Sequence, residues 1–290
     1  MTHSETAPHP RTIFVSDLDG TLLDANARVT PRSARLLNDA INRGCLFTVA
    51  TARTPATVQS IMRDVQMRLP AIVMTGAAWW HFDSQTYSHV KKIDSDSAAT
   101  VIKAFQDQGV TPFVYTLDVT RKPNILNVYF NSIDPTEPDR KFISQRKGSA
   151  IKNFYVGQPV PDCNLSDIML FFASGDHSDL RRVADTVQSL TRCYVSVYND
   201  VYNPGLALIE VFAHGVSKAN ALMQLKNELQ SSRLVVFGDN LNDLSMFSVA
   251  DVPIAVDNAL PRVKDAANIV IGDNNHDAVA QFLADYPNIL

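Results

Sequence analysis

Residues 11–24 read RTIFVSDLDGTLLD, an apolar run that ends in two aspartates two positions apart. Residues 11–16 are typical of a short buried strand, and Asp17 and Asp19 come at its end. In an open parallel sheet, ligands bind beyond the carboxyl ends of the strands. This stretch therefore predicts a sheet whose strand ends carry the chemistry of the protein.

Strands and helices alternate on either side of this stretch. Thr30 and Pro31 are typical of a helix start, and Gly44 is expected to end that helix. Further elements are expected as a strand over residues 46–50, a helix from Thr54–Pro55, and a strand over 71–74. The rhythm returns near the end of the chain, with helices over 217–229, 244–249 and 276–285 and strands over 234–237, 252–256 and 268–271. Short connections between such elements predict a parallel sheet covered on both faces.

The middle of the chain has a different pattern. Its strands look longer and more alternating, as over residues 124–131, 168–173 and 194–198, with helices over 97–108 and 178–190. This pattern favours an α+β block with an antiparallel sheet. We therefore expect an α/β core domain built from residues 1–83 and 211–290, with a second domain inserted over residues 84–210.

Composition excludes several classes of protein. The chain has 290 residues, 46% hydrophobic and 19% charged, and 26 basic against 30 acidic side chains give a net charge of −4. This is a globular profile, and it argues against nucleic acid as the main partner, because phosphate neutralisation needs a basic face. No apolar run is long enough for a membrane span, and residues 1–10 resemble a loose tail rather than a signal peptide. The three scattered cysteines predict no disulfide framework, so a cytoplasmic protein is expected.

Four predicted strand ends carry polar groups: Asp17 with Asp19, Thr51, Lys218, and Asp239 with Asp243. Clustered carboxylates repel each other, and a hard divalent cation such as Mg²⁺ would relieve that repulsion. Mg²⁺ in turn works with phosphate oxygens, and a nearby lysine adds positive charge, so the set suggests phosphoryl transfer. Taken singly, each feature has a simpler interpretation: a turn with Asx capping, a threonine cap, or a solvated lysine.

Four segments together closely resemble the ordered motifs of the haloacid dehalogenase superfamily. They are Asp17-Leu18-Asp19-Gly20-Thr21-Leu22-Leu23-Asp24, Ala50-Thr51-Ala52-Arg53, Gly215-Val216-Ser217-Lys218 and Gly238-Asp239-Asn240-Leu241-Asn242-Asp243. The large insertion between the second and third motifs resembles the Cof-like sugar-phosphatase branch. The resemblance implies a Rossmann-like core, an inserted α/β cap that sets specificity, and a Mg²⁺-dependent phosphatase. Ala52, Thr75 and Ala219 depart from the pattern of that branch, which bears on the substrate more than on the reaction.

Residue roles follow from the chemistry together with this resemblance. Asp17 is the expected nucleophile and Asp19 the expected general acid and base. Phosphoryl oxygens are expected to bind Thr51, Lys218, Leu18 and Arg53. The metal ligands implied are the Asp17 carboxylate, the Asp19 backbone carbonyl and Asp239, with Asp243 behind them as support and Asn242 either as support or as a further ligand.

Three functions are compatible with these residues. The leading one is hydrolysis of small phosphomonoesters, such as sugar phosphates or related metabolites, through an aspartyl-phosphate. A phosphotransferase of the phosphohexomutase type shares the motifs but returns the phosphoryl group to a sugar. A noncatalytic sensor of phosphorylated ligands is the third, and the intact set of catalytic side chains disfavours it.

Overall fold

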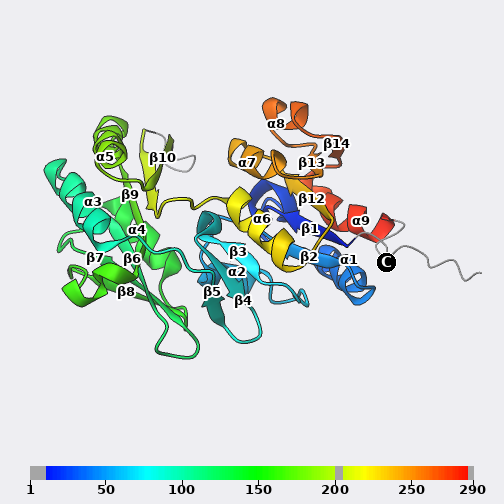
Figure 1. Ribbon diagram of the computed structural model, residues 1–290, viewed down its shortest axis with the longest axis horizontal. Coiled ribbons are helices and arrows are strands. Elements are labelled where there is room, and N and C mark those ends of the chain that lie inside the picture. The colour runs from blue at the N-terminus through cyan, green and yellow to red at the C-terminus, as the bar shows by residue number, and fades with distance from the viewer. Residues whose placement is uncertain (1–10, 200–204, 287–290) are drawn as a thin grey trace, which may run out of the picture. The chain divides into compact units, whose positions relative to one another are not determined.

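The computed structural model describes residues 11–199 and 205–286, and Figure 1 shows its helices and strands. The chain divides into two compact units: a core unit formed by Met1–Gly76 and Ser217–Leu290, and an inserted unit formed by Ala77–Val216. The tail expected over residues 1–10 lies outside the described residues. Within the described ranges, no helix is both long and apolar enough to cross a bilayer.

The core unit contains the predicted parallel sheet. Its five strands, in spatial order, are β14 (Ile269–Ile271), β13 (Val252–Val256), β12 (Arg233–Gly238), β1 (Thr12–Ser16) and β2 (Leu46–Val49). Every strand pair in this sheet is parallel. Ala50 adds a parallel bridge to Ile72 of β3 (Ala71–Val73). The interior strand β1 thus lies between β2, from the beginning of the chain, and β12, from its last third.

Helices flank this sheet (Figure 1). They are α1 (Pro31–Asn42), α2 (Pro55–Ile61), α6 (Lys218–Glu228), α7 (Leu244–Phe247), α8 (Pro261–Asp265) and α9 (Ala278–Asp285). α1 contacts α9, and Phe282 of α9 lies edge-on against Phe237 of β12. α6 contacts α7, which also packs against β12 and β13. The fold class predicted from the sequence, a parallel-sheet core with flanking helices, is therefore confirmed.

The inserted unit is built around a six-stranded sheet. In spatial order its strands are β10 (Tyr194–Asn199), β11 (Ala207–Phe212), β9 (Ile168–Gly175), β6 (Phe113–Asp118), β7 (Ile125–Phe130) and β8 (Lys152–Val156). A separate hairpin joins β4 (Ala78–His81) to β5 (Thr86–Ser88). The helices are α3 (Ser95–Asp107), α4 (Glu137–Arg146) and α5 (His177–Leu190).

Helices cover both faces of this second sheet. Neighbouring residues of a strand point to opposite faces, and Phe171 and Phe172 are neighbours in β9. Phe105 of α3 stacks on Phe171, whereas Phe142 of α4 stacks on Phe172. All six residues of β7 are buried, because the sheet is covered on both sides.

One strand pair differs from the antiparallel sheet predicted for the inserted unit. β7 and β8 are parallel, because α4, which the sequence interpretation did not include, connects them as a crossover. A capping box between Thr136 and Asp139 begins α4, and this signal was available in the sequence. The helix has no buried residues, so its weak apolar stripe gave no periodic signal.

The boundaries of the two units differ from the predicted ones by six or seven residues. The prediction divided the chain at 83/84 and 210/211, whereas the compact units divide at Gly76/Ala77 and Val216/Ser217. The hairpin of β4 and β5 lies on the inserted-unit side of the first boundary, and Lys91 N donates to Ala77 O at 2.8 Å. β11 accounts for part of the second, since it continues to Phe212.

Asp277 ties the start of α1 to the start of α9. Its carboxylate accepts hydrogen bonds from Thr30 Oγ1 at 2.5 Å and Ser33 Oγ at 2.8 Å, and it faces Arg32 Nη1 at 3.4 Å. Burial alone would raise the pKa of Asp277, but these three partners outweigh it and hold the pKa below the ordinary value of 3.8. The backbone of Asp277 is left-handed, with φ 59°.

Asp277→Ala is expected to lower the free energy of unfolding by about 1–3 kcal/mol at pH 7, because two hydroxyls lose their acceptor. Asp277→Asn is the matched control, since Asn tolerates the left-handed backbone and still accepts hydrogen bonds. Because the folded-state pKa is lowered, the stabilisation is present above about pH 4 and is lost as the pH falls through the lowered pKa. Urea unfolding at pH 7 and at about pH 3 measures this, and equal stability of wild type and Asp277→Ala at pH 7 would contradict it.

Candidate active site

Asp17 lies at the carboxyl end of β1, an interior strand of the core sheet between β12 and β2. Its backbone N–H donates to Phe237 O at 3.0 Å, which continues the pairing of β1 with β12 by one residue. The residue is 6% exposed. The sheet thus places this carboxylate in a buried position at the end of the sheet where the parallel strands terminate.

Lys218 is the first residue of α6, and its ammonium lies between two carboxylates. Nζ donates to Asp17 Oδ1 at 2.6 Å and to Asp243 Oδ1 at 2.9 Å, and the side chain is 2% exposed. Burial lowers the pKa of Lys218, but the two carboxylates outweigh burial and raise the pKa above its ordinary value. Lys218 therefore stays charged and holds both acids in place.

Asp243 is fully buried and uses both carboxylate oxygens. Oδ1 accepts from Lys218, and Oδ2 accepts from the backbone N–H groups of Asp239 at 3.1 Å and Asn240 at 3.2 Å. Gly238 leaves room for this turn, because a Cβ there would lie 2.7 Å from Cβ of Asp243. Asp243 therefore fixes the lysine and the turn after β12 rather than facing open space.

Asp239 meets the loop that follows β1. Its Oδ1 accepts from Thr21 Oγ1 at 2.7 Å. Burial raises the pKa of Asp239 to about 6, although the hydrogen bond from Thr21 opposes the rise. Gly20 has φ 76°, and a Cβ at this position would overlap the Asp239 carboxylate. Only glycine fits here, for both conformational and steric reasons.

The charges of this cluster do not balance. Oxygens of Asp17, Asp239 and Asp243 lie within 4.8 Å of one another, and Lys218 is the cation that pairs with two of them. Burial and the neighbouring carboxylates hold the pKa of Asp17 above its usual range despite Lys218. Three carboxylates and one ammonium carry a net charge of −2, which a divalent cation with oxygen ligands would neutralise.

Two oxygens of the cluster are open to such a cation. Among the described residues, no hydrogen-bond donor contacts Asp17 Oδ2 or Asp239 Oδ2, whereas both oxygens of Asp243 are occupied. These carboxylate oxygens therefore fit a magnesium ion bound by Asp17 and Asp239. Asp243 would support that site through Lys218 and the turn after β12.

The Asp19 carboxylate is not part of this cluster. It is 52% exposed, and Arg53 binds both of its oxygens, with Nε at 2.7 Å from Oδ2 and Nη2 at 2.5 Å from Oδ1. The loop around it is tied down by Asn258, whose Nδ2 donates to Gly20 O at 2.7 Å. Asp19 is therefore held at the rim while Asp17 lies in the interior.

Thr51 lies at the end of the neighbouring strand and is 1% exposed. Its Oγ1 accepts from Arg53 N at 3.1 Å, which leaves the hydroxyl proton to donate to another group. Thr75 N donates to Thr51 O at 3.0 Å, and Met74 N donates to Arg53 O at 3.0 Å. These contacts fix the loop that carries both Thr51 and Arg53.

The turn that makes these contacts is strained. Met74, Thr75 and Gly76 all have positive φ, at 50°, 58° and 96°. Left-handed backbone is rare for a β-branched residue such as threonine. A Cβ on Gly76 would overlap the backbone carbonyl of Ser217, so this turn fits closely against the start of α6, from which Lys218 projects.

Two residues from the predicted site lie apart from the carboxylate cluster. The Leu18 side chain is fully buried, so only its backbone can face a ligand. Asn242 is exposed, and among the described residues no contact of its side chain reaches the cluster. Sequence reasoning assigned no role to Thr21 or Asn258. Thr21 stands in the quoted motif, whereas nothing local marks Asn258, which acts from the far end of the chain.

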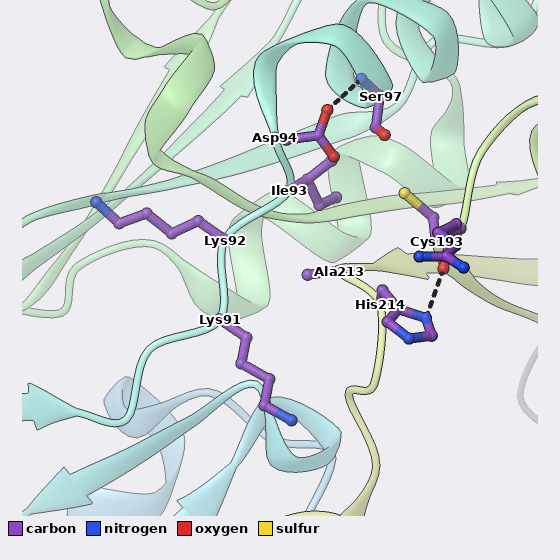
Figure 2. Close-up of a pocket in the computed structure, with 9 residues that line it drawn as sticks. Lys91, Lys92, Ile93, Asp94, Ser97, Cys193, Ala213 and His214 are labelled. Carbon is purple, nitrogen blue, oxygen red and sulfur yellow. Dashed lines mark hydrogen bonds between the residues drawn. The ribbon is translucent and has the colours of Figure 1, made fainter.

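A cavity of about 340 Å³ lies elsewhere, within the inserted unit. Figure 2 shows it bordered by residues 91–94 and by Cys193, Ala213 and His214. It contains none of the predicted site residues. Its polar groups have partners of their own: Lys91 Nζ donates to Gly215 O, and Asp94 accepts from Ser97 N. The chemistry of the motifs is therefore in the core unit and not in this cavity.

Comparison with known proteins gives a consistent result. Residues 14–283 match the family of haloacid dehalogenase-like hydrolases. The 5-amino-6-(5-phospho-D-ribitylamino)uracil phosphatase YwtE of Bacillus subtilis is 23% identical over 92% of this chain and 95% of its own. Pyridoxal phosphate phosphatase YbhA of Escherichia coli is 24% identical over 93% and 97%. The crystal structure of TM0651 from Thermotoga maritima shares the fold, with a TM-score of 0.73 and 23% identity over 93% of this chain and 96% of that one.

Lys218→Met is expected to lower the free energy of unfolding by about 3–5 kcal/mol in excess chelator, because two buried carboxylates lose their cation. Adding Asp17→Asn to this variant should recover part of the loss, since one of the two uncompensated charges is removed. Lys226→Met is the matched control: its ion pair with Asp251 is partly exposed and is worth about 1 kcal/mol or less. Urea unfolding at pH 8 compares the variants, and a Lys218→Met protein as stable as Lys226→Met would contradict the proposed network.

Proposed function

The chain belongs to the haloacid dehalogenase-like hydrolases, and from that premise we propose that it is a magnesium-dependent phosphatase of small phosphomonoesters. The observation that carries the proposal is the buried Asp17–Lys218–Asp243 network with Asp239 beside it. This arrangement gives one carboxylate a free oxygen next to a fixed cation. Phosphoryl transfer needs such positioning and charge stabilisation more than it needs covalent chemistry from other groups.

Asp17 is the proposed nucleophile. An oxygen of its carboxylate attacks phosphorus, the bond from phosphorus to the ester oxygen breaks, and an aspartyl-phosphate forms. The departing oxygen takes a proton from the Asp19 carboxyl group. In the second step a water molecule gives a proton to Asp19 and attacks phosphorus, which releases phosphate and restores Asp17.

The phosphoryl oxygens are held by groups that still have hydrogen-bonding capacity. Thr51 has a hydroxyl proton to donate, since its oxygen already accepts from Arg53 N. The Lys218 ammonium and the backbone of Leu18 complete this proposed set. Mg²⁺, held by the carboxylates of Asp17 and Asp239 and by the Asp19 carbonyl, would neutralise the charge that builds up on the transferring group.

Small phosphorylated metabolites, sugar phosphates among them, are the proposed substrates. The relatives named above are phosphatases of a ribitylaminouracil phosphate and of pyridoxal phosphate, which supports the phosphomonoester class. We assign the choice among such substrates to the inserted unit, acting as a cap. The described cysteines Cys45, Cys163 and Cys193 are free thiols, which supports a reducing, cytoplasmic setting.

Phosphate release from a panel of phosphometabolites with Mg²⁺ tests the proposal, with Asp17→Asn as the control. Wild type is expected to release free phosphate from at least one compound, and quenched samples should carry one phosphoryl group on Asp17 by mass spectrometry. Asp17→Asn should show neither, while its circular dichroism and cooperative thermal unfolding show that it still folds, since Lys218 keeps Asp243 as a partner. Release by Asp17→Asn at the wild-type rate would overturn the nucleophile, and an isomerised sugar phosphate in place of free phosphate would indicate a mutase.

Chelation is expected to abolish activity, and added Mg²⁺ to restore it. Mg²⁺ should also raise the midpoint of thermal unfolding, because it binds the folded site and not the open chain. Asp239→Ala should remove most of that rise, since it deletes one of the two open carboxylates. Full activity in excess EDTA, or an unchanged Mg²⁺ titration of Asp239→Ala, would refute the metal site.

A further inference from the structure

Arg53 forms a bidentate ion pair with the Asp19 carboxylate. Nε and Nη2 donate to different oxygens of Asp19, at 2.7 Å and 2.5 Å. A two-point contact of this kind fixes the plane of a carboxylate, which a single ammonium cannot do. No other described residue donates a hydrogen bond to the Asp19 side chain.

The backbone of Arg53 is as constrained as its side chain. Its N–H donates to Thr51 Oγ1, and its carbonyl accepts from Met74 N. Met74 belongs to the left-handed turn that also fits against the start of α6. The guanidinium therefore projects toward Asp19 from a fixed point of the core unit.

Stability does not explain this contact. The side chains of Arg53 and Asp19 are 27% and 52% exposed, and ion pairs so accessible to water contribute little to folding. Asp19 follows Leu18 in the loop after β1, and a half-exposed aspartate in a loop would otherwise turn freely about its side-chain bonds. The contact restricts the one carboxylate of the first motif that lies outside the buried network.

We propose that Arg53 is a positioning residue that orients Asp19 for proton transfer, rather than a ligand of the substrate phosphate. The inference rests on the proposed function, because it assigns the task that Asp19 performs there. One Asp19 oxygen passes the proton to the departing ester oxygen, and later accepts one from water, through the lone pair that the guanidinium leaves open, so that both contacts with Arg53 persist. Arg53 acts only through Asp19.

The rates of two Arg53 variants on two phosphate esters test this assignment. Arg53→Ala is expected to lower kcat on an alkyl phosphate by about 10²-fold, the scale of a misplaced catalytic group. On nitrophenyl phosphate, whose leaving oxygen needs little protonation, the rate of the first step should fall far less. Arg53→Lys should recover little on the alkyl ester, because an ammonium cannot hold both oxygens. Inhibition by inorganic phosphate should stay at the wild-type level in both variants.

The Asp19→Ala background gives the decisive readout. If Arg53 acts through Asp19, then Asp19→Ala and Asp19→Ala/Arg53→Ala should have the same kcat and the same inhibition constant for phosphate. A further loss in the double variant, weaker phosphate inhibition in Arg53→Ala, or full recovery by Arg53→Lys would overturn the assignment. These outcomes leave Asp17-dependent turnover intact, whereas failure of the proposed function would appear as wild-type protein that releases no phosphate.

Discussion

A single buried ammonium, that of Lys218 between the carboxylates of Asp17 and Asp243, is the interaction on which the rest of the core depends. Burying such ions is costly, and apolar side chains of similar size would often be at least as stable. The network unites three distant parts of the chain: the end of β1, the start of α6 and the turn after β12. These three parts come together because both ends of the chain fold into the same core unit.

Close backbone contacts make that arrangement possible. Gly20 and Gly76 leave no space for a side chain, the first against Asp239 and the second against Ser217. The left-handed Met74 and Thr75 hold the loop of Thr51 through backbone hydrogen bonds. Strain of this kind persists only where the surroundings enforce it, and it is commonly found at functional sites. Here it fixes two neighbouring loops relative to the helix that carries Lys218.

The sequence predicted the core sheet well, because each strand is a short apolar run that ends in polar residues. The parallel pairing of β7 with β8 was missed because α4 buries no residue and leaves no apolar period to detect. The contact of Arg53 with Asp19 and that of Asn258 with Gly20 depend on side chains meeting across distant segments. No local pattern encodes such meetings, so Arg53 was predicted as a site residue without its partner, and Asn258 was not predicted at all.

The interrupted core also constrains how the protein is made. During synthesis β1 leaves the ribosome early, but its partner β12 is among the last strands to emerge, since Thr12 pairs with Arg233. The inserted unit is one continuous segment with its own interior, so it can fold before β12 has been made. During that time the edge of β1 that later pairs with β12 has no partner strand. Such an edge invites pairing with other chains. The half-built sheet therefore stays open to such pairing until the last third of the chain has been made.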